Sequence, residues 1–222
     1  MVEVAKGDLI VGAFGVRYAT LEAVGGWQGI GHDRQMEALT GAGLFGKATS
    51  RSVILPSLLS LAYKGHVLLG GKKATMSDYV PDVPEREFGL PVVLIIGTSM
   101  SAGKTTSAKV SVRLLKEAGL SVIGAKLTGA GRYRDILAMQ DAGAESVFDF
   151  VDAGLPSTVV PEKEYRRVLR NLLSRMAAVE ADVLVARRSA PRPSSPTTAR
   201  RPSRSSARTC AARCSPPPTL TP

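Results

Sequence analysis

Residues 92–106 place the tightest constraint on how this chain can fold. An apolar run over 92–96 ends at Gly97, and after a short loop Gly103, Lys104 and Thr105 open a helical pattern. A strand, a loop and a helix N-terminus in this order are what a phosphate-cradling loop requires. The alternative is an ordinary turn with an incidental lysine, but such a turn does not require all three parts to agree in register. We therefore expect this segment to bind nucleotide phosphates.

The chemistry of such a loop assigns a role to most of its residues. Backbone N–H groups point at phosphate oxygens, and the helix dipole adds to their field. Lys104 would neutralise the β- and γ-phosphates, the Thr105 hydroxyl would bind Mg²⁺, and Thr106 could reach the α-phosphate. We predict ATP or GTP, with Mg²⁺, as the cofactors. The predicted nucleotide-binding residues are Gly97, Thr98, Ser99, Met100, Ser101, Ala102, Gly103, Lys104, Thr105 and Thr106.

The spacing of this loop points to a subgroup of nucleotide-binding proteins. Five residues, 98–102, separate its two glycines, so Thr98 stands at the usual first-glycine position. The pattern Gly-Thr-x-x-x-x-Gly-Lys-Thr resembles dethiobiotin synthetase and its relatives in the SIMIBI class of P-loop proteins, although Ser99 stands where that family has aspartate. The segment 124–129 is similar to the family's Lys-Pro-x-x-(Thr/Ser)-Gly segment near substrate and phosphate. That resemblance implies a ligand contact for Lys126 alone, since Leu127 replaces the proline.

Two further segments carry weaker resemblances. Arg134-Asp135 followed by residues 141–144 is similar to a segment of the molybdopterin-guanine dinucleotide biosynthesis protein B family. Residues 148–158 resemble a bacterial P-loop family labelled a domain of unknown function, some members of which are linked to D-amino-acid N-acylation. Together the resemblances cover residues 92–186.

The periodicity after residue 91 predicts an α/β domain over 91–186. We expect strands at 92–96, 120–125, 146–151 and 182–186, and helices at 104–118, 135–142 and 161–179. Alternating strands and helices imply a parallel, right-handed sheet, here an incomplete one. Spacing at i, i+4 and i+8 predicts that Val110, Leu114 and Ala118 form the buried side of the first helix.

The first ninety residues have a different pattern. Glycine-rich, short apolar runs predict a small β-rich domain over 1–80, followed by a proline-punctuated linker over 81–90. Runs at 9–11 and 16–18 suggest paired strands, and Gly70-Gly71 predicts a hairpin turn. Weaker helical patterns occupy 34–39 and 56–63.

The C-terminal segment, 187–222, is compositionally unlike the rest. It has eight arginines and no acidic residue, which leaves only +2 of the total net charge of +10 for residues 1–186. We predict a disordered tail. It lacks aromatic residues for base stacking, so we do not expect it to bind nucleic acid. Related P-loop proteins place an acidic, Mg²⁺-binding residue just after this last strand, where Arg187 stands. Our hypothesis is that a frameshift near residue 187 replaced the remainder of a longer protein.

Outside the loop, four side chains are candidates for chemistry. Lys126 ends a predicted strand at the ligand edge of the sheet and would contact phosphate or substrate, unless it is simply solvated. Asp135 would hold Mg²⁺ or cap its helix. Asp152, just past the third strand, is the stronger candidate for a metal or base role, and Asp149 is the weaker one. The predicted catalytic set is Lys104, Lys126 and Asp152, and the predicted metal set is Thr105, Asp135 and Asp152.

These expectations combine into one function with two alternatives. We predict Mg²⁺-dependent binding of a nucleoside triphosphate, with phosphoryl transfer or hydrolysis acting on an unknown small-molecule substrate. The alternatives are a non-catalytic nucleotide-dependent switch, which could act as a homodimer, and a truncated, inactive relic of such an enzyme. No apolar run reaches the ~18 residues of a membrane span, and the N-terminus lacks a signal-peptide pattern. We therefore expect a cytoplasmic protein without a membrane partner.

Overall fold

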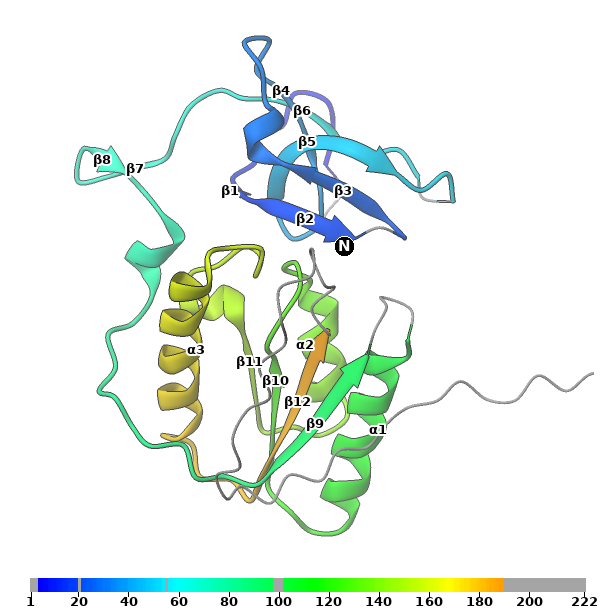
Figure 1. Cartoon of the computed structure of the whole chain (residues 1–222), viewed down its shortest axis with the longest axis vertical. Coiled ribbons are helices and arrows are strands. Elements are labelled where there is room, and N and C mark those ends of the chain that lie inside the picture. The colour runs from blue at the N-terminus through cyan, green and yellow to red at the C-terminus, as the bar shows by residue number, and fades with distance from the viewer. Residues whose placement is uncertain (1–3, 20, 55, 98–101, 190–222) are drawn as a thin grey trace, which may run out of the picture.

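Two structural regions follow one another along the chain: a β-rich region and an α/β region with a parallel sheet (Figure 1). The computed structural model describes residues 4–19, 21–54, 56–97 and 102–189. This division agrees with the mixed α/β class predicted from the sequence. Thr98 to Ser101 of the predicted loop and residues 190–222 of the predicted tail lie outside the described residues.

The β-rich region is one sheet of short strands, ordered β2-β3-β5-β4-β6, with β1 pairing β5. All its pairings are antiparallel except β1 with β5. Leu39, Leu44 and Phe45 are among its buried side chains. Its strands are β1 (Ala13–Phe14), β2 (Val16–Ala19), β3 (Ala23–Gly26), β4 (Gln35–Ala38), β5 (Leu44–Arg51) and β6 (Ser60–Ala62), and η1 (Trp27–Gly29) is a 3₁₀ turn.

Three predictions for this region were wrong. The segments 34–39 and 56–63 are not helices, because they contribute β4 and β6, which pair with each other. Residues 9–11 form no strand, and β2 pairs with β3 instead. Segments this short fit either period, so distant pairing partners settled their conformation.

The predicted glycine hairpin is confirmed, and the linker follows it. Strands β7 (Leu68–Leu69) and β8 (Lys72–Lys73) pair across Gly70 and Gly71, whose φ values of 57° and 79° are left-handed. The 3₁₀ turn η2 (Met76–Tyr79) comes next. Residues 80–91 then run without helix or strand to the second region.

The α/β region contains a parallel sheet ordered β11-β10-β12-β9, which confirms the predicted parallel arrangement. Helices α1 and α2 cover one face, and α3 covers the other (Figure 1). The strands are β9 (Val92–Gly97), β10 (Val122–Lys126), β11 (Ser146–Asp149) and β12 (Val183–Ser189), the helices are α1 (Lys104–Glu117), α2 (Tyr133–Gln140) and α3 (Glu162–Met176), and η3 (Phe150–Ala153) is a 3₁₀ turn.

Helix α1 lies on the sheet by a different side from the one predicted. Val110 and Leu114 are 50% and 60% exposed, whereas Ala108 and Val112 are fully buried. Lys104 is also buried, and it stands four residues before Ala108, so all three share one face. The helix therefore lies on the sheet through the face that carries Lys104, Ala108 and Val112.

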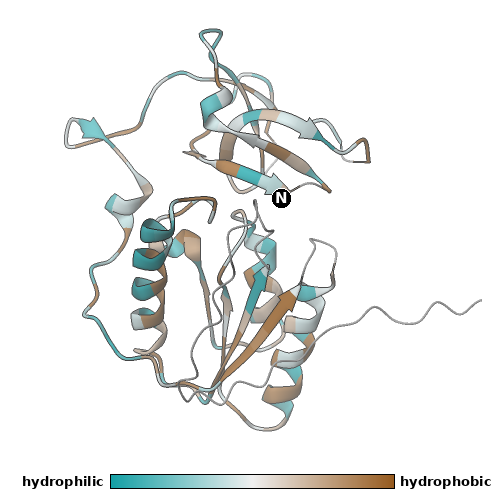
Figure 2. Cartoon of the chain, viewed as in Figure 1, coloured by the Kyte–Doolittle hydropathy of each residue, from teal (hydrophilic) through white to brown (hydrophobic). Residues whose placement is uncertain are grey.

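Strand β12 extends further than predicted. It continues through Ser189, and Arg187 and Arg188 pair with Ile95 and Ile96 of β9. The boundary expected between 186 and 187 is therefore wrong, because ladder hydrogen bonds come from the backbone and do not depend on side-chain type. Figure 2 shows the result, a hydrophobic β9 beside a strand that turns hydrophilic at its carboxyl end.

The β-rich region lies over the carboxyl ends of the parallel strands (Figure 1). The Ser157 hydroxyl donates to the Val16 carbonyl at 2.6 Å, and Arg132 forms an ion pair with Glu22 at 3.1 Å. This region therefore covers part of the edge where ligands bind in open α/β sheets. In the described part of the chain, no helix has both the length and the apolar character needed to cross a membrane.

Candidate functional site

The two ends of the predicted phosphate loop are built around Lys104. Gly97 ends β9, and a Cβ there would lie 2.8 Å from Cγ and 2.9 Å from Cδ of Lys104. The Lys104 stem therefore folds back over Gly97, where only glycine leaves room for it. Gly103, directly before α1, has a φ of 69°, which also favours glycine. The local geometry thus favours glycine at both positions, as the predicted loop requires.

Lys104 is a buried cation at this position, only 3% exposed. Burial lowers the pKa of its ammonium group, and the neighbouring Arg187 guanidinium lowers it further, while Asp135 opposes the shift. A bound anion would oppose both effects and raise the pKa, because it favours the charged amine.

Four side chains from four elements meet beside Lys104. Lys126 Nζ at the end of β10 lies 2.9 Å from Asp135 Oδ2 on α2. Arg187 Nη1 on β12 lies 2.8 Å from Asp135 Oδ1 and donates to Thr105 Oγ1 at 2.9 Å. The Thr105 hydroxyl in turn donates to Asp135 Oδ1 at 3.3 Å. The fold thus brings Thr105, Lys126 and Asp135, all predicted site residues, into one cluster.

Asp135 is the anion at the centre of this cluster. Burial acts to raise the pKa of its carboxyl group, but Lys126 and Arg187 outweigh burial and hold that pKa below its usual value. The carboxylate is therefore charged at neutral pH and divides its two oxygens between two cations.

Lys126 joins the cluster to a second carboxylate. Its ammonium group is 2% exposed, donates to the Ala130 carbonyl at 2.7 Å and lies 3.9 Å from Asp149 Oδ2. It also sits 5.3 Å from the Phe150 ring centroid. Burial lowers its pKa, and Asp149 and Asp135 oppose that shift. Lys126 is thus buried and paired, rather than the solvated lysine considered as its alternative.

Asp149 has the most perturbed carboxyl group in the cluster. Burial, reinforced by nearby Asp152, raises its pKa to about 7, although Lys126 acts in the opposite direction. Its Oδ1 is buried without a hydrogen-bond partner in the described part of the chain. A carboxyl group that titrates near neutrality is suited to accept or donate a proton. The sequence ranked it below Asp152 because burial cannot be seen in the residue pattern.

Asp152 has a different environment from the one expected of a metal ligand. Its Oδ2 accepts the Asp149 backbone N–H at 2.7 Å, and the two residues form a reciprocal capping box around η3. Among the described residues, no hydrogen bond or ion pair links Asp152 to Thr105 or Asp135. The structure thus brings two of the three predicted metal ligands together and gives the third a capping role.

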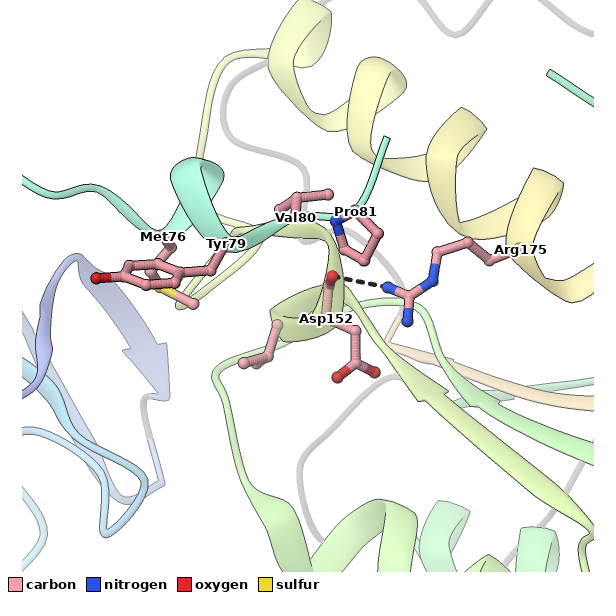
Figure 3. A pocket seen from close by; sticks show the side chains of 7 residues that line it. Met76, Tyr79, Val80, Pro81, Asp152 and Arg175 are labelled. Carbon is pink, nitrogen blue, oxygen red and sulfur yellow. Dashed lines mark hydrogen bonds between the residues drawn. The ribbon is translucent and has the colours of Figure 1, made fainter. Parts of the chain in front are cut away.

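Asp152 also lines a cavity of about 370 Å³ between η2, η3 and α3 (Figure 3). Figure 3 shows Arg175 reaching the Asp152 backbone, where Nη1 donates to the carbonyl oxygen at 2.8 Å. The lining combines a carboxylate, a guanidinium group and apolar side chains, and the hollow is open to solvent. The lining residues are Met76, Tyr79, Val80, Pro81, Val151, Asp152 and Arg175.

The cluster does not fit a bound Mg²⁺. The oxygens of Thr105 and Asp135 that were predicted to ligate the ion both contact Arg187 Nη1. Within the described ranges, no group of three or more His, Cys, Asp or Glu side chains could hold a metal. Sequence reasoning noticed the reversed charge at Arg187 but assigned the residue to a tail. Alternation along the strand after Val183 and Val185 was the signal that could have placed it on this face.

No protein-family model, curated protein or solved structure matches this chain. The resemblances to P-loop families therefore stay predictions.

Proposed function

We propose that this chain binds a nucleoside triphosphate, ATP or GTP, between the end of β9 and the start of α1. The observation that carries the proposal is the Lys104 side chain folded over Gly97 at the N-terminus of a fourteen-residue helix. Backbone N–H groups of the first helical turn have no partner within the helix and attract anions. The buried side chain of Lys104 adds a positive charge at the same end of the helix.

The charges around the loop also favour a polyphosphate. Lys104, Lys126 and Arg187 are all buried, and Arg187 acts to lower the pKa of both lysines. An incoming anion would be attracted by all three cations and would offset the repulsion between them. The β-rich region above the strand ends would shield such a ligand from water, which strengthens each electrostatic contact.

The test is nucleotide affinity of the Lys104→Ala variant, measured by calorimetry against the wild type. A charge-assisted contact contributes about 1.5–3 kcal/mol, so we expect affinity to fall by roughly 10- to 100-fold. Lys109→Ala is the matched control, because it removes the same charge from an exposed position on the same helix. Equal affinities of wild type and Lys104→Ala for ATP and GTP would refute the site.

Transfer of a phosphoryl group to a small molecule is a second candidate, favoured by Asp149 and the neighbouring cavity. Asp149 could accept a proton at neutral pH, and the cavity beside Asp152 could hold the acceptor. Mass spectrometry of reactions with candidate carboxylates and amines would detect a phosphorylated product. Loss of that product in Asp149→Asn with unchanged nucleotide affinity is the expected result. Nucleotide-dependent dimerisation without any product would instead favour the switch.

A further inference from the structure

We propose that Arg187 takes the place of the divalent cation in this site, so that the chain selects a metal-free nucleotide over its magnesium complex. This inference rests on the proposed nucleotide binding and specifies the form of nucleotide that is bound. It begins from the position of β12, which lies between β9 and β10. Arg187 pairs with Ile95 on one side and with Lys126 on the other, so it stands at the centre of the ligand edge.

The contacts of Arg187 are those that a small cation would make. One nitrogen, Nη1, lies 2.9 Å from a hydroxyl oxygen, Thr105 Oγ1, and 2.8 Å from a carboxylate oxygen, Asp135 Oδ1. Hydroxyl and carboxylate oxygens are the ligands that Mg²⁺ prefers. The Thr105 hydroxyl accepts from Arg187 and donates to Asp135, so its hydrogen and one of its two lone pairs are already engaged.

The surrounding charges oppose entry of a metal ion. A divalent cation at Asp135 would approach Arg187, Lys126 and Lys104, and the carboxylate already holds the first two. Arginine stays protonated throughout the accessible pH range, so raising the pH does not release the position. The same three cations suit the additional negative charge that a nucleotide carries when magnesium is removed.

The strand geometry shows that this placement is specific to Arg187. Side chains alternate along β12, and Val183 and Val185 belong to the core under α1 and α2. Arg187 continues on this face, whereas Arg188 follows Leu184 and Ala186 onto the α3 face. Two adjacent arginines thus differ in their access to the cluster, and Arg188 becomes a control of equal charge.

The experiment measures ATP affinity of the full chain by calorimetry in EDTA and in excess MgCl₂. We expect the wild type to bind ATP more tightly in EDTA than in excess magnesium. Arg187→Asp should lose affinity in EDTA by about tenfold or more and recover part of it with magnesium. Arg187→Lys and Arg188→Asp should both bind ATP more tightly in EDTA than in magnesium, as the wild type does.

A second readout works without nucleotide. Electron paramagnetic resonance of Mn²⁺ added to the ligand-free protein should show no binding to the wild type and binding to Arg187→Asp. If Arg187→Asp does not fold, the ATP affinities of the wild type in EDTA and in magnesium are sufficient to test the proposal.

The outcomes separate the two proposals. Wild-type binding that is equally tight or tighter in magnesium overturns the role of Arg187 and leaves nucleotide binding intact. Mn²⁺ binding to the ligand-free wild type also overturns it. Absence of ATP and GTP binding in both buffers refutes the proposed function and, with it, the preference for a metal-free nucleotide.

Discussion

Replacing Asp135 with asparagine tests whether the buried ionic cluster holds the α/β region together. The substitution keeps the shape of the side chain but removes the anion that Lys126 and Arg187 share at 2.9 and 2.8 Å. Breaking a buried pair by removing one partner typically costs about 3–5 kcal/mol, because the remaining charges stay buried without compensation. Asp135 retains some contact with solvent and asparagine still offers one acceptor oxygen, so we expect a loss of about 3 kcal/mol in the free energy of unfolding.

The assay is urea unfolding followed by circular dichroism, with Glu117→Gln as the matched control. Arg113 and Glu117 form an ion pair of the same length, 2.9 Å, but their side chains are 73% and 57% exposed. An exposed pair spaced at i, i+4 contributes about 0.3–0.5 kcal/mol. The difference in burial therefore predicts a much larger loss of stability in Asp135→Asn than in Glu117→Gln. Adding Lys126→Met to Asp135→Asn should restore part of the loss, because the orphaned cation is then removed.

The pH dependence of the unfolding free energy provides a second test of the contribution of Asp135. The pKa of Asp135 is lower in the folded chain than in the unfolded chain, so its contribution to stability is present above the unfolded value of about 3.9. That contribution is lost as the pH falls through the folded value. Equal losses in Asp135→Asn and Glu117→Gln at neutral pH would refute the argument that burial makes this pair strong.

Three further predictions concern other parts of the site and its support. The pKa of Asp149 is raised to about 7, so the folded state retains its proton between about pH 4 and 7, and the associated stability is lost as pH rises through 7. Asp149→Asn should remove this pH dependence of the unfolding free energy, as measured by urea unfolding at acidic and mildly alkaline pH. An unchanged pH dependence in the variant would show that the Asp149 carboxyl group is not its cause. Val112→Ala should cost about 2 kcal/mol in unfolding free energy and Leu114→Ala far less, because only Val112 is fully buried; equal costs would contradict the orientation of α1. Gly97→Ala should weaken nucleotide binding by roughly tenfold or more while retaining the fold, since the added Cβ displaces the Lys104 stem; unchanged affinity in calorimetry would count against the loop geometry.

Local patterns were sufficient for much of the α/β region and for the glycine hairpin that precedes it. The run over 92–96 became β9, the helical pattern from residue 104 became α1, and the Gly70-Gly71 pair became a hairpin turn. Each depends on residues close in sequence: a continuous apolar strand, a 3.6-residue period, or glycines that accept positive φ. The roles of Gly97 and Gly103 could likewise be predicted from the sequence, because the chain must turn between the strand and the helix.

Other features of the fold and of the site depended on contacts between residues that are far apart along the chain. The short segments 34–39 and 56–63 contribute β4 and β6, which pair with each other, and Val110 is exposed because α1 packs on the sheet through Ala108 and Val112. Composition alone assigned Arg187 to a tail. Its backbone instead pairs on both sides within the sheet, and strand alternation directs its side chain to Thr105 and Asp135. The sequence by itself thus determined a strand that ends at Gly97 and a helix that begins at Lys104, and it predicted a phosphate loop between them. Only the tertiary structure decided which charges meet beside it, since Coulomb interactions depend on distance in space and on burial, neither of which sequence spacing shows.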